Sequence, residues 1–136
     1  MIKKCCLAIV VASCSIASHA ELTVTEKILS LSRPAACEVS KEIERNDLPP
    51  TPQNMSLPAY GQGIIGWGTG ADGALKKLQT VNVADVKVYQ QKGVTLAMVQ
   101  EWQRFYENET QRNSCNPTAP IRAALMATIA HLWIFA

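Results

Sequence analysis

Cysteine and histidine are the residue types in this sequence best suited to chemistry, with five of the first and two of the second in 136 residues. Only Cys37, Cys115 and His131 lie outside residues 1–20. Two cysteines in an oxidising compartment most simply pair, so we predict a structural disulfide between Cys37 and Cys115. One histidine beside two paired cysteines cannot form an ordinary zinc site. The sequence therefore predicts no metal site, no cofactor and no catalytic residues, which favours a non-enzymatic protein without deciding the matter.

Residues 1–20 have the pattern of a secretory signal peptide. Two lysines precede an uncharged stretch, and Ser18-His19-Ala20 places small residues at the −3 and −1 positions. We expect cleavage after Ala20 and a periplasmic or secreted protein. Val11-Ala12-Ser13-Cys14 also resembles a lipobox, so an envelope lipoprotein anchored through Cys14 is an alternative. The apolar stretch is too short to span a membrane permanently.

Composition and charge describe one small globular domain over residues 21–136. The chain is 48% apolar and 18% charged. Losing Lys3 and Lys4 with the leader leaves 11 basic residues against the 11 acidic ones. Because no basic cluster remains, we expect neither nucleic-acid binding nor electrostatic membrane binding.

Hydrophobic spacing and capping signals predict an all-α fold of about five helices in a compact single domain. The expected helices cover residues 22–48, with a kink or break at Pro34, then 69–79, 81–92, 95–112 and a last one from Pro117 or Pro120 onward. Ala36, Val39 and Ile43 continue the helical spacing beyond Pro34. Residues 47–70 contain four prolines and no hydrophobic period, so we expect a long irregular Pro/Gly-rich segment there.

Six of the seven glycines fall between residues 60 and 73. Gly61-Gln62-Gly63-Ile64-Ile65-Gly66 matches the dinucleotide fingerprint, but a Pro-rich stretch precedes it and no parallel-sheet pattern surrounds it, so we reject that interpretation. Free N–H groups at the next helix start could bind an anion, although Asp72 would repel one. The segment is otherwise a tight packed turn, with Ile64, Ile65 and Trp67 filling the core, or a partner-binding loop. For the latter, the candidate residues are Tyr60, Ile64, Ile65, Trp67, Thr69 and Asp72.

The string Ile65-Gly66-Trp67-Gly68-Thr69-Gly70, followed by Gly73-Ala74, resembles the signature of a small bacterial domain family of unknown function. The resemblance covers about residues 60 to 133 and continues through Gly93-Val94-Thr95, Trp102, Phe105-Tyr106, Asn116-Pro117 and Arg122-Ala123-Ala124-Leu125-Met126. It implies export and a helical domain, with no known catalytic residues. It also implies a likeness to domains at the ends of large secreted toxin-like proteins.

The sequence therefore leaves three alternative hypotheses for the function. The favoured hypothesis is a small exported, non-enzymatic module that binds another envelope or extracellular protein through the glycine segment. A secreted toxin-like or hydrolytic effector is the alternative that the resemblance implies. A structural lipoprotein anchored through Cys14 is the third.

Overall fold

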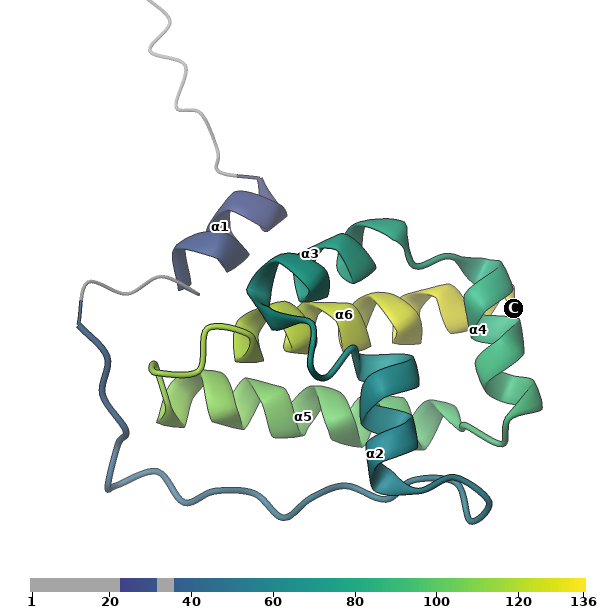
Figure 1. Cartoon of the computed structure of the whole chain (residues 1–136), viewed down its shortest axis with the longest axis horizontal. Helices are drawn as coiled ribbons and strands as arrows, with labels where there is room; N and C mark the ends of the chain where they lie inside the picture. The colour runs from purple at the N-terminus through teal and green to yellow at the C-terminus, as the bar shows by residue number, and fades with distance from the viewer. Residues whose placement is uncertain (1–22, 32–35) are drawn as a thin grey trace, which may run out of the picture.

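The computed structural model describes residues 23–31 and 36–136 of the chain (Figure 1). This described part is all-α, as the sequence predicts. Its elements are α1 (Val24–Leu31), α2 (Leu57–Tyr60), the π-helical turn η1 (Gly61–Ile65), α3 (Gly70–Thr80), α4 (Val83–Gln91), α5 (Leu96–Arg112), α6 (Ala119–Leu132) and the 3₁₀ turn η2 (Trp133–Phe135). Among these helices, none is both long and apolar enough to cross a membrane.

Helices α5 and α6 lie side by side and run in opposite directions through the centre of the molecule (Figure 1). Val99, Trp102 and Tyr106 recur at helical spacing on α5 and are buried. On α6 the facing residues Leu125 and Ile129 are fully buried. The start of α5 is fixed by Thr95, whose Oγ1 accepts a hydrogen bond of 3.2 Å from the Met98 N–H.

Helices α3 and α4 cover one side of this pair. The Asn82 side chain accepts hydrogen bonds from the Ala84 and Asp85 N–H groups, and Asp85 accepts one from the Asn82 N–H. This reciprocal capping box sets the start of α4 where the sequence predicts it. Helix α1 packs through Ile28 against Ala74 of α3 and Ile121 of α6. The predicted boundaries of α3, α4 and α5 are thus correct within about two residues.

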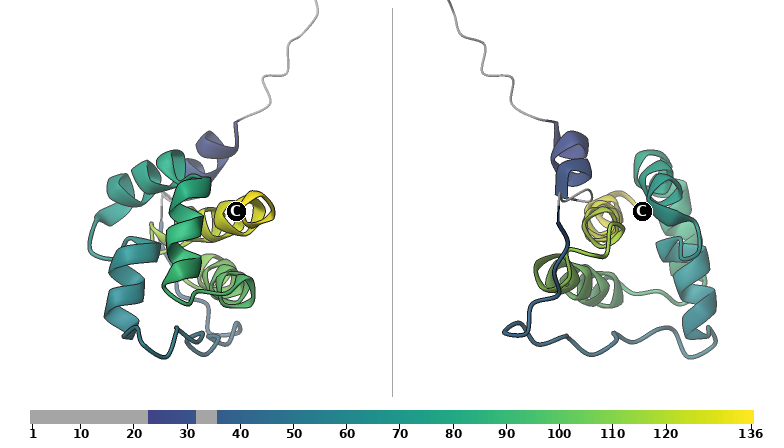
Figure 2. Two further views of the ribbon diagram at one scale, coloured as in Figure 1. Left: turned by 90° about the vertical axis from the view of Figure 1, so that its right-hand side faces the viewer. Right: turned by 60° about the vertical axis from the view of Figure 1, so that its left-hand side comes forward.

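The predicted helix over residues 22–48 is wrong beyond α1. Pro34 lies outside the described residues. Residues 36–56, which we call the strap, are largely extended and keep to the α5 side of the molecule, opposite α1 and α3 (Figures 1 and 2). Their backbone groups bond to α5 and the turn after it. The Ser40 N–H donates to the Arg112 carbonyl at 2.7 Å, and the Asn46 N–H donates to Asn108 Oδ1 at 2.9 Å. The apolar spacing predicted a helix here, but backbone groups of these residues form hydrogen bonds with α5 and the turn after it instead of with one another.

The expected irregular segment over residues 47–70 is also partly wrong, because residues 57–65 are helical. Ser56 caps α2 by accepting a 3.3 Å hydrogen bond from the Ala59 N–H. The chain then widens into η1, and Gly66 ends the turn with φ +85°, a conformation that glycine adopts without strain. The glycines therefore build a compact helical turn rather than a free loop.

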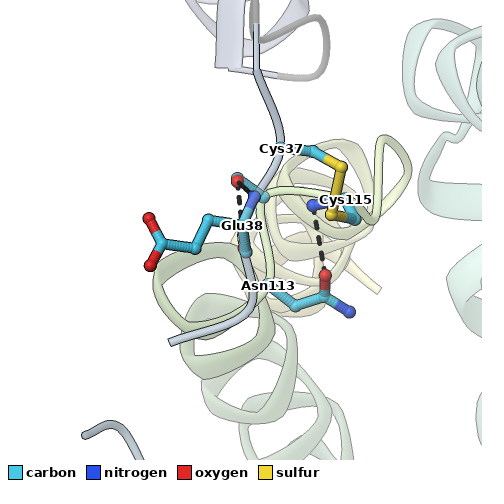
Figure 3. Close-up of a disulfide and its surroundings, with 5 residues drawn as sticks. Cys37, Glu38, Asn113 and Cys115 are labelled. Atoms are coloured by element: carbon cyan, nitrogen blue, oxygen red, sulfur yellow. Dashed lines mark hydrogen bonds between the residues drawn. A yellow bond between two sulfur atoms is a disulfide. The ribbon is translucent and has the colours of Figure 1, made fainter. Parts of the chain in front are cut away.

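The predicted disulfide between Cys37 and Cys115 is confirmed (Figure 3). It joins the start of the strap to the turn between α5 and α6. Around it, the Ser114 N–H donates to the Glu38 carbonyl at 3.0 Å, and the Cys115 N–H donates to Asn113 Oδ1 at 3.1 Å. Val39 and Asn113 form an isolated antiparallel bridge beside it. The strap is thus attached covalently at one end and by hydrogen bonds along its length.

Candidate functional site

Three of the six residues expected to contact a partner are buried in the core. Tyr60, Ile64 and Ile65 are 0–1% exposed. The Tyr60 ring stacks on Trp102 with 5.5 Å between centroids. These side chains therefore do not present a docking surface, and the prediction is corrected for them. The alternative interpretation, a packed turn with Ile64 and Ile65 in the core, agrees with their burial, because the glycine-rich stretch folds as a helical turn with an inner face.

The other three candidates lie at the surface end of the same segment. Trp67 is half-buried, and its Nε1–H donates a 2.6 Å hydrogen bond to Tyr106 Oη. Thr69 is exposed, and its hydroxyl donates to the Gly66 carbonyl at 2.7 Å. Asp72 is exposed in the first turn of α3. Trp67 lines the pocket described next, whereas Thr69 and Asp72 do not.

An open pocket of about 380 Å³ lies where the strap, the turn after η1, α5 and the start of α6 meet. Its size falls within the range of about 300–1,000 Å³ that is usual for small-ligand sites. Its lining combines aromatic, apolar and charged side chains. The lining residues are Arg45, Leu48, Trp67, Gly68, Phe105, Tyr106, Glu109, Asn116 and Arg122.

Glu109 is a buried carboxylate that lines this pocket, with 4% of the residue exposed. Its Oε1 lies 2.9 Å from Arg112 Nη2 and 3.2 Å from Arg45 Nε. The Arg45 guanidinium also lies over the Phe105 ring, 5.5 Å from its centroid. Both guanidinium groups contact the same carboxylate oxygen, so two positive charges lie beside the negative charge of Glu109.

Arg122 is the lining residue without a counter-ion. No described carboxylate lies within ion-pair distance of its guanidinium, and its buried Nε has no hydrogen-bond partner. The guanidinium lies over the Tyr106 ring, 5.9 Å from its centroid. Asn116 sits nearby with its Oδ1 accepting from the Thr118 N–H and hydroxyl, at 3.2 and 2.9 Å. This arrangement leaves the Asn116 amide N–H groups available for a ligand.

Tyr106 joins the aromatic wall to these donors. Burial, with a smaller contribution from the Glu109 charge, raises the pKa of its phenol, against the opposing effects of the Trp67 hydrogen bond and of the charge and hydrogen bonding of Arg122. The phenol is therefore neutral at physiological pH, and its oxygen accepts from Trp67. Removing water from this wall also strengthens the electrostatic interactions of Arg122 next to it.

A second pocket, of about 460 Å³, lies between α1, α3 and α6. It is lined mainly by apolar side chains, with His131 at its edge. His131 is exposed and packs edge-on against Phe135. Across the described ranges 23–31 and 36–136, no three His, Cys, Asp or Glu residues lie close enough to hold a metal ion.

A sequence model described as "Domain of unknown function (DUF4951)" matches residues 35–133 of this chain. The chain belongs to the DUF4951 family. The family description carries no activity. The association with toxin-like proteins that the resemblance implies stays a prediction.

A solved NMR structure of a protein from Acinetobacter baumannii is similar to this DUF4951 chain. The two are 53% identical in sequence, and the similarity covers 71% of this chain and 90% of the other, with a TM-score of 0.59. The search of curated proteins gives no match.

The pocket lies wholly inside the DUF4951 match, since its lining residues fall between positions 45 and 122. Of the six partner-binding candidates from the sequence, Trp67 lines this pocket, and its role in binding stays a prediction. Arg122 and Asn116 were missed, although both belong to the strings that carried the resemblance. The signal that could have found Arg122 is its position as a lone charge in the first turns of an otherwise apolar helix.

Proposed function

We propose that this DUF4951 protein is a small, non-enzymatic binding module that recognises another protein of the envelope or extracellular space through the pocket around Trp67 and Arg122. The observation that carries the proposal is the combination of aromatic walls, an apolar rim and an arginine without a counter-ion in one open pocket. Leu48 forms part of the rim and is 52% exposed. Tryptophan, tyrosine and arginine are the residue types that contribute most to protein–protein binding.

The chemistry of the lining supports binding over catalysis. Acid–base or nucleophilic catalysis needs a nucleophile beside a base, or a carboxylate free to exchange protons. The lining residues include no serine, cysteine, histidine or lysine, and the carboxylate of Glu109 is held by two arginines. What remains are hydrogen-bond donors and aromatic surface, which hold a ligand without transforming it.

The proposed compartment is supported by the sequence and by the cross-link. Residues 1–20 have the pattern of a leader, and the Cys37–Cys115 disulfide suits an oxidising environment. Disulfides persist mainly in secreted and periplasmic proteins.

Affinity capture with matched surface variants tests the proposal. The full chain is the bait in native envelope and culture fluid, and captured proteins are identified by mass spectrometry and re-tested as purified partners. Leu48→Asp places a charge on the apolar rim and is expected to weaken the partner by about tenfold or more. Trp67→Ala is a poor probe, because Trp67 also packs edge-on against Trp102 in the core.

Val88→Asp is the matched control. Val88 is 43% exposed on α4, and it is absent from the lining of the pocket. Both variants should melt at the wild-type temperature. A purified partner that binds wild type and Val88→Asp equally, and binds Leu48→Asp much less, supports the proposal. Equal binding to all three proteins, or the absence of any partner, refutes it.

A further inference from the structure

We propose that the pocket recognises the C-terminal carboxylate of a partner polypeptide whose last residue has a large apolar side chain. This inference rests on the proposed function and names the chemistry of the ligand. It follows from the donors, the walls and the charge of the pocket, taken in that order.

The lining offers a ligand two groups that donate hydrogen bonds, on Arg122 and Asn116. The Arg122 guanidinium has no ion pair with a described residue, and the Asn116 amide nitrogen has no partner in the described structure. The one carboxylate in the lining, on Glu109, is already neutralised by Arg45 and Arg112. A ligand that complements this set must bring acceptors and negative charge, and guanidinium groups match the two oxygens of a carboxylate especially well.

The walls beside these donors are apolar and aromatic. The Trp67, Phe105 and Tyr106 rings line the same pocket, and Leu48 extends the apolar surface at its rim. These walls are rigid because Trp67 is bonded to Tyr106, and both rings pack against Trp102. A ligand therefore needs an apolar group close to its negative charge.

The C-terminal residue of a polypeptide carries both groups on one Cα atom. An aspartate or glutamate inside a chain carries the charge on one residue and the apolar group on another, which separates them by several ångströms along the backbone. A single pocket of about 380 Å³, with donors and aromatic walls together, fits the terminal residue better.

Titrations of the full chain, disulfide intact, with small probes test this assignment. The probes are N-acetyl-phenylalanine, its uncharged amide, a capped Phe-Glu dipeptide whose only carboxylate is on the side chain, and phenyl phosphate. Chemical-shift changes or calorimetry report the dissociation constants. We expect N-acetyl-phenylalanine to bind at least about tenfold more tightly than the other three probes, because only it carries a carboxylate and a benzyl side chain on the same Cα atom.

Arg122→Gln should weaken N-acetyl-phenylalanine to the level of its amide, and Arg122→Lys should restore part of the loss by keeping the charge. Arg104→Gln is the control, since Arg104 is an exposed arginine on α5 that does not line the pocket. The assignment would be overturned if N-acetyl-phenylalanine and its amide bound equally well, or if Arg122→Gln bound N-acetyl-phenylalanine as tightly as wild type. Tighter binding of the dipeptide or of phenyl phosphate would also overturn it.

The two proposals fail in different ways. A partner protein that is lost by Leu48→Asp but kept by Arg122→Gln would leave the binding module standing and remove the carboxylate. In the opposite case, N-acetyl-phenylalanine would bind through Arg122, but no partner protein would be sensitive to Leu48→Asp. That result would support the carboxylate site and remove the protein-binding module.

Discussion

Glu109 links the strap to α5 at the level of single atoms. It belongs to α5, yet its Oε1 pairs with Arg45 of the strap as well as with Arg112 of its own helix. Arg45 has 57% of its side chain exposed, so its pair with Glu109 contributes little to stability. The Arg112 side chain is 16% exposed and bonds to Glu109 through both Nε and Nη2. The Glu109 carboxylate is therefore needed chiefly to neutralise the largely buried guanidinium of Arg112.

We predict that Glu109→Gln lowers the free energy of unfolding by about 2–3 kcal/mol, because it leaves a largely buried guanidinium without a counter-ion. Urea unfolding followed by circular dichroism measures the change. Glu107→Gln is the control, since Glu107 is exposed on the same helix and bonds only to Gln103. That variant should stay within about 0.5 kcal/mol of wild type. Equal losses in both variants would contradict the prediction.

At the scale of elements, η1 positions Trp67 by close packing of backbone against ring. A Cβ atom at Gly61 would overlap the six-membered ring of the Trp67 indole, whereas a Cβ at Gly63 would meet nothing within 4 Å. The Trp67 N–H donates to the Gly61 carbonyl at 2.8 Å, which closes the turn. Lys77 of α3 donates from Nζ to the Gly63 carbonyl at 2.5 Å and joins η1 to α3.

Alanine at these two glycines should therefore have opposite effects. Gly61→Ala is expected to destabilise by about 2–3 kcal/mol, because the ring of Trp67 must move away from Trp102. Gly63→Ala should be neutral or stabilise by up to about 1 kcal/mol, since alanine favours helical backbone and has room. Thermal melts of both variants decide between these outcomes. A destabilising Gly63→Ala together with a neutral Gly61→Ala would show that the packing is misassigned.

The same contrast shows what the sequence could and could not predict. Local signals such as the Asn82–Asp85 capping box predicted α4 correctly, because a cap acts within one turn. The strap and the turn after η1 depend on partners far along the chain, such as Asn108 for Asn46 and Tyr106 for Trp67, so periodicity could not find them. The sequence singled out Trp67, which lines the pocket, but it did not predict the pocket itself. Its donors converge only when the α5–α6 turn brings them together.

At the scale of the whole molecule, three tyrosines are buried in one core cluster. Burial raises the pKa of Tyr60, Tyr89 and Tyr106 above the ordinary value of 10.0, and raises that of Tyr89 to about 12. The unfolded chain therefore releases these protons before the folded chain does. Stability that is fully present below pH 10 falls as the pH rises from about 10 toward 12.

Tyr89→Phe isolates one of these groups. We expect the free energy of unfolding of wild type to fall more steeply than that of the variant between pH 10 and 12, by up to about 1.4 kcal/mol per pH unit. Burial lowers the pKa of Lys77, so this residue changes the stability with pH in the opposite direction. Its contribution is the same in wild type and Tyr89→Phe and cancels when the two are compared. Urea unfolding at pH 8, 9, 10 and 11 measures both curves. Parallel curves above pH 10 would contradict the assignment.

The bond between Cys37 and Cys115, which are 78 positions apart, encloses most of the exposed strap and most of the helices. A protease that cuts the strap once would therefore release no fragment. The nicked protein would remain a single covalent molecule of two chains and would separate only when a thiol reduces the bond. In a compartment rich in proteases, damage to the strap would thus go unseen on a non-reducing gel, and only reduction would reveal it.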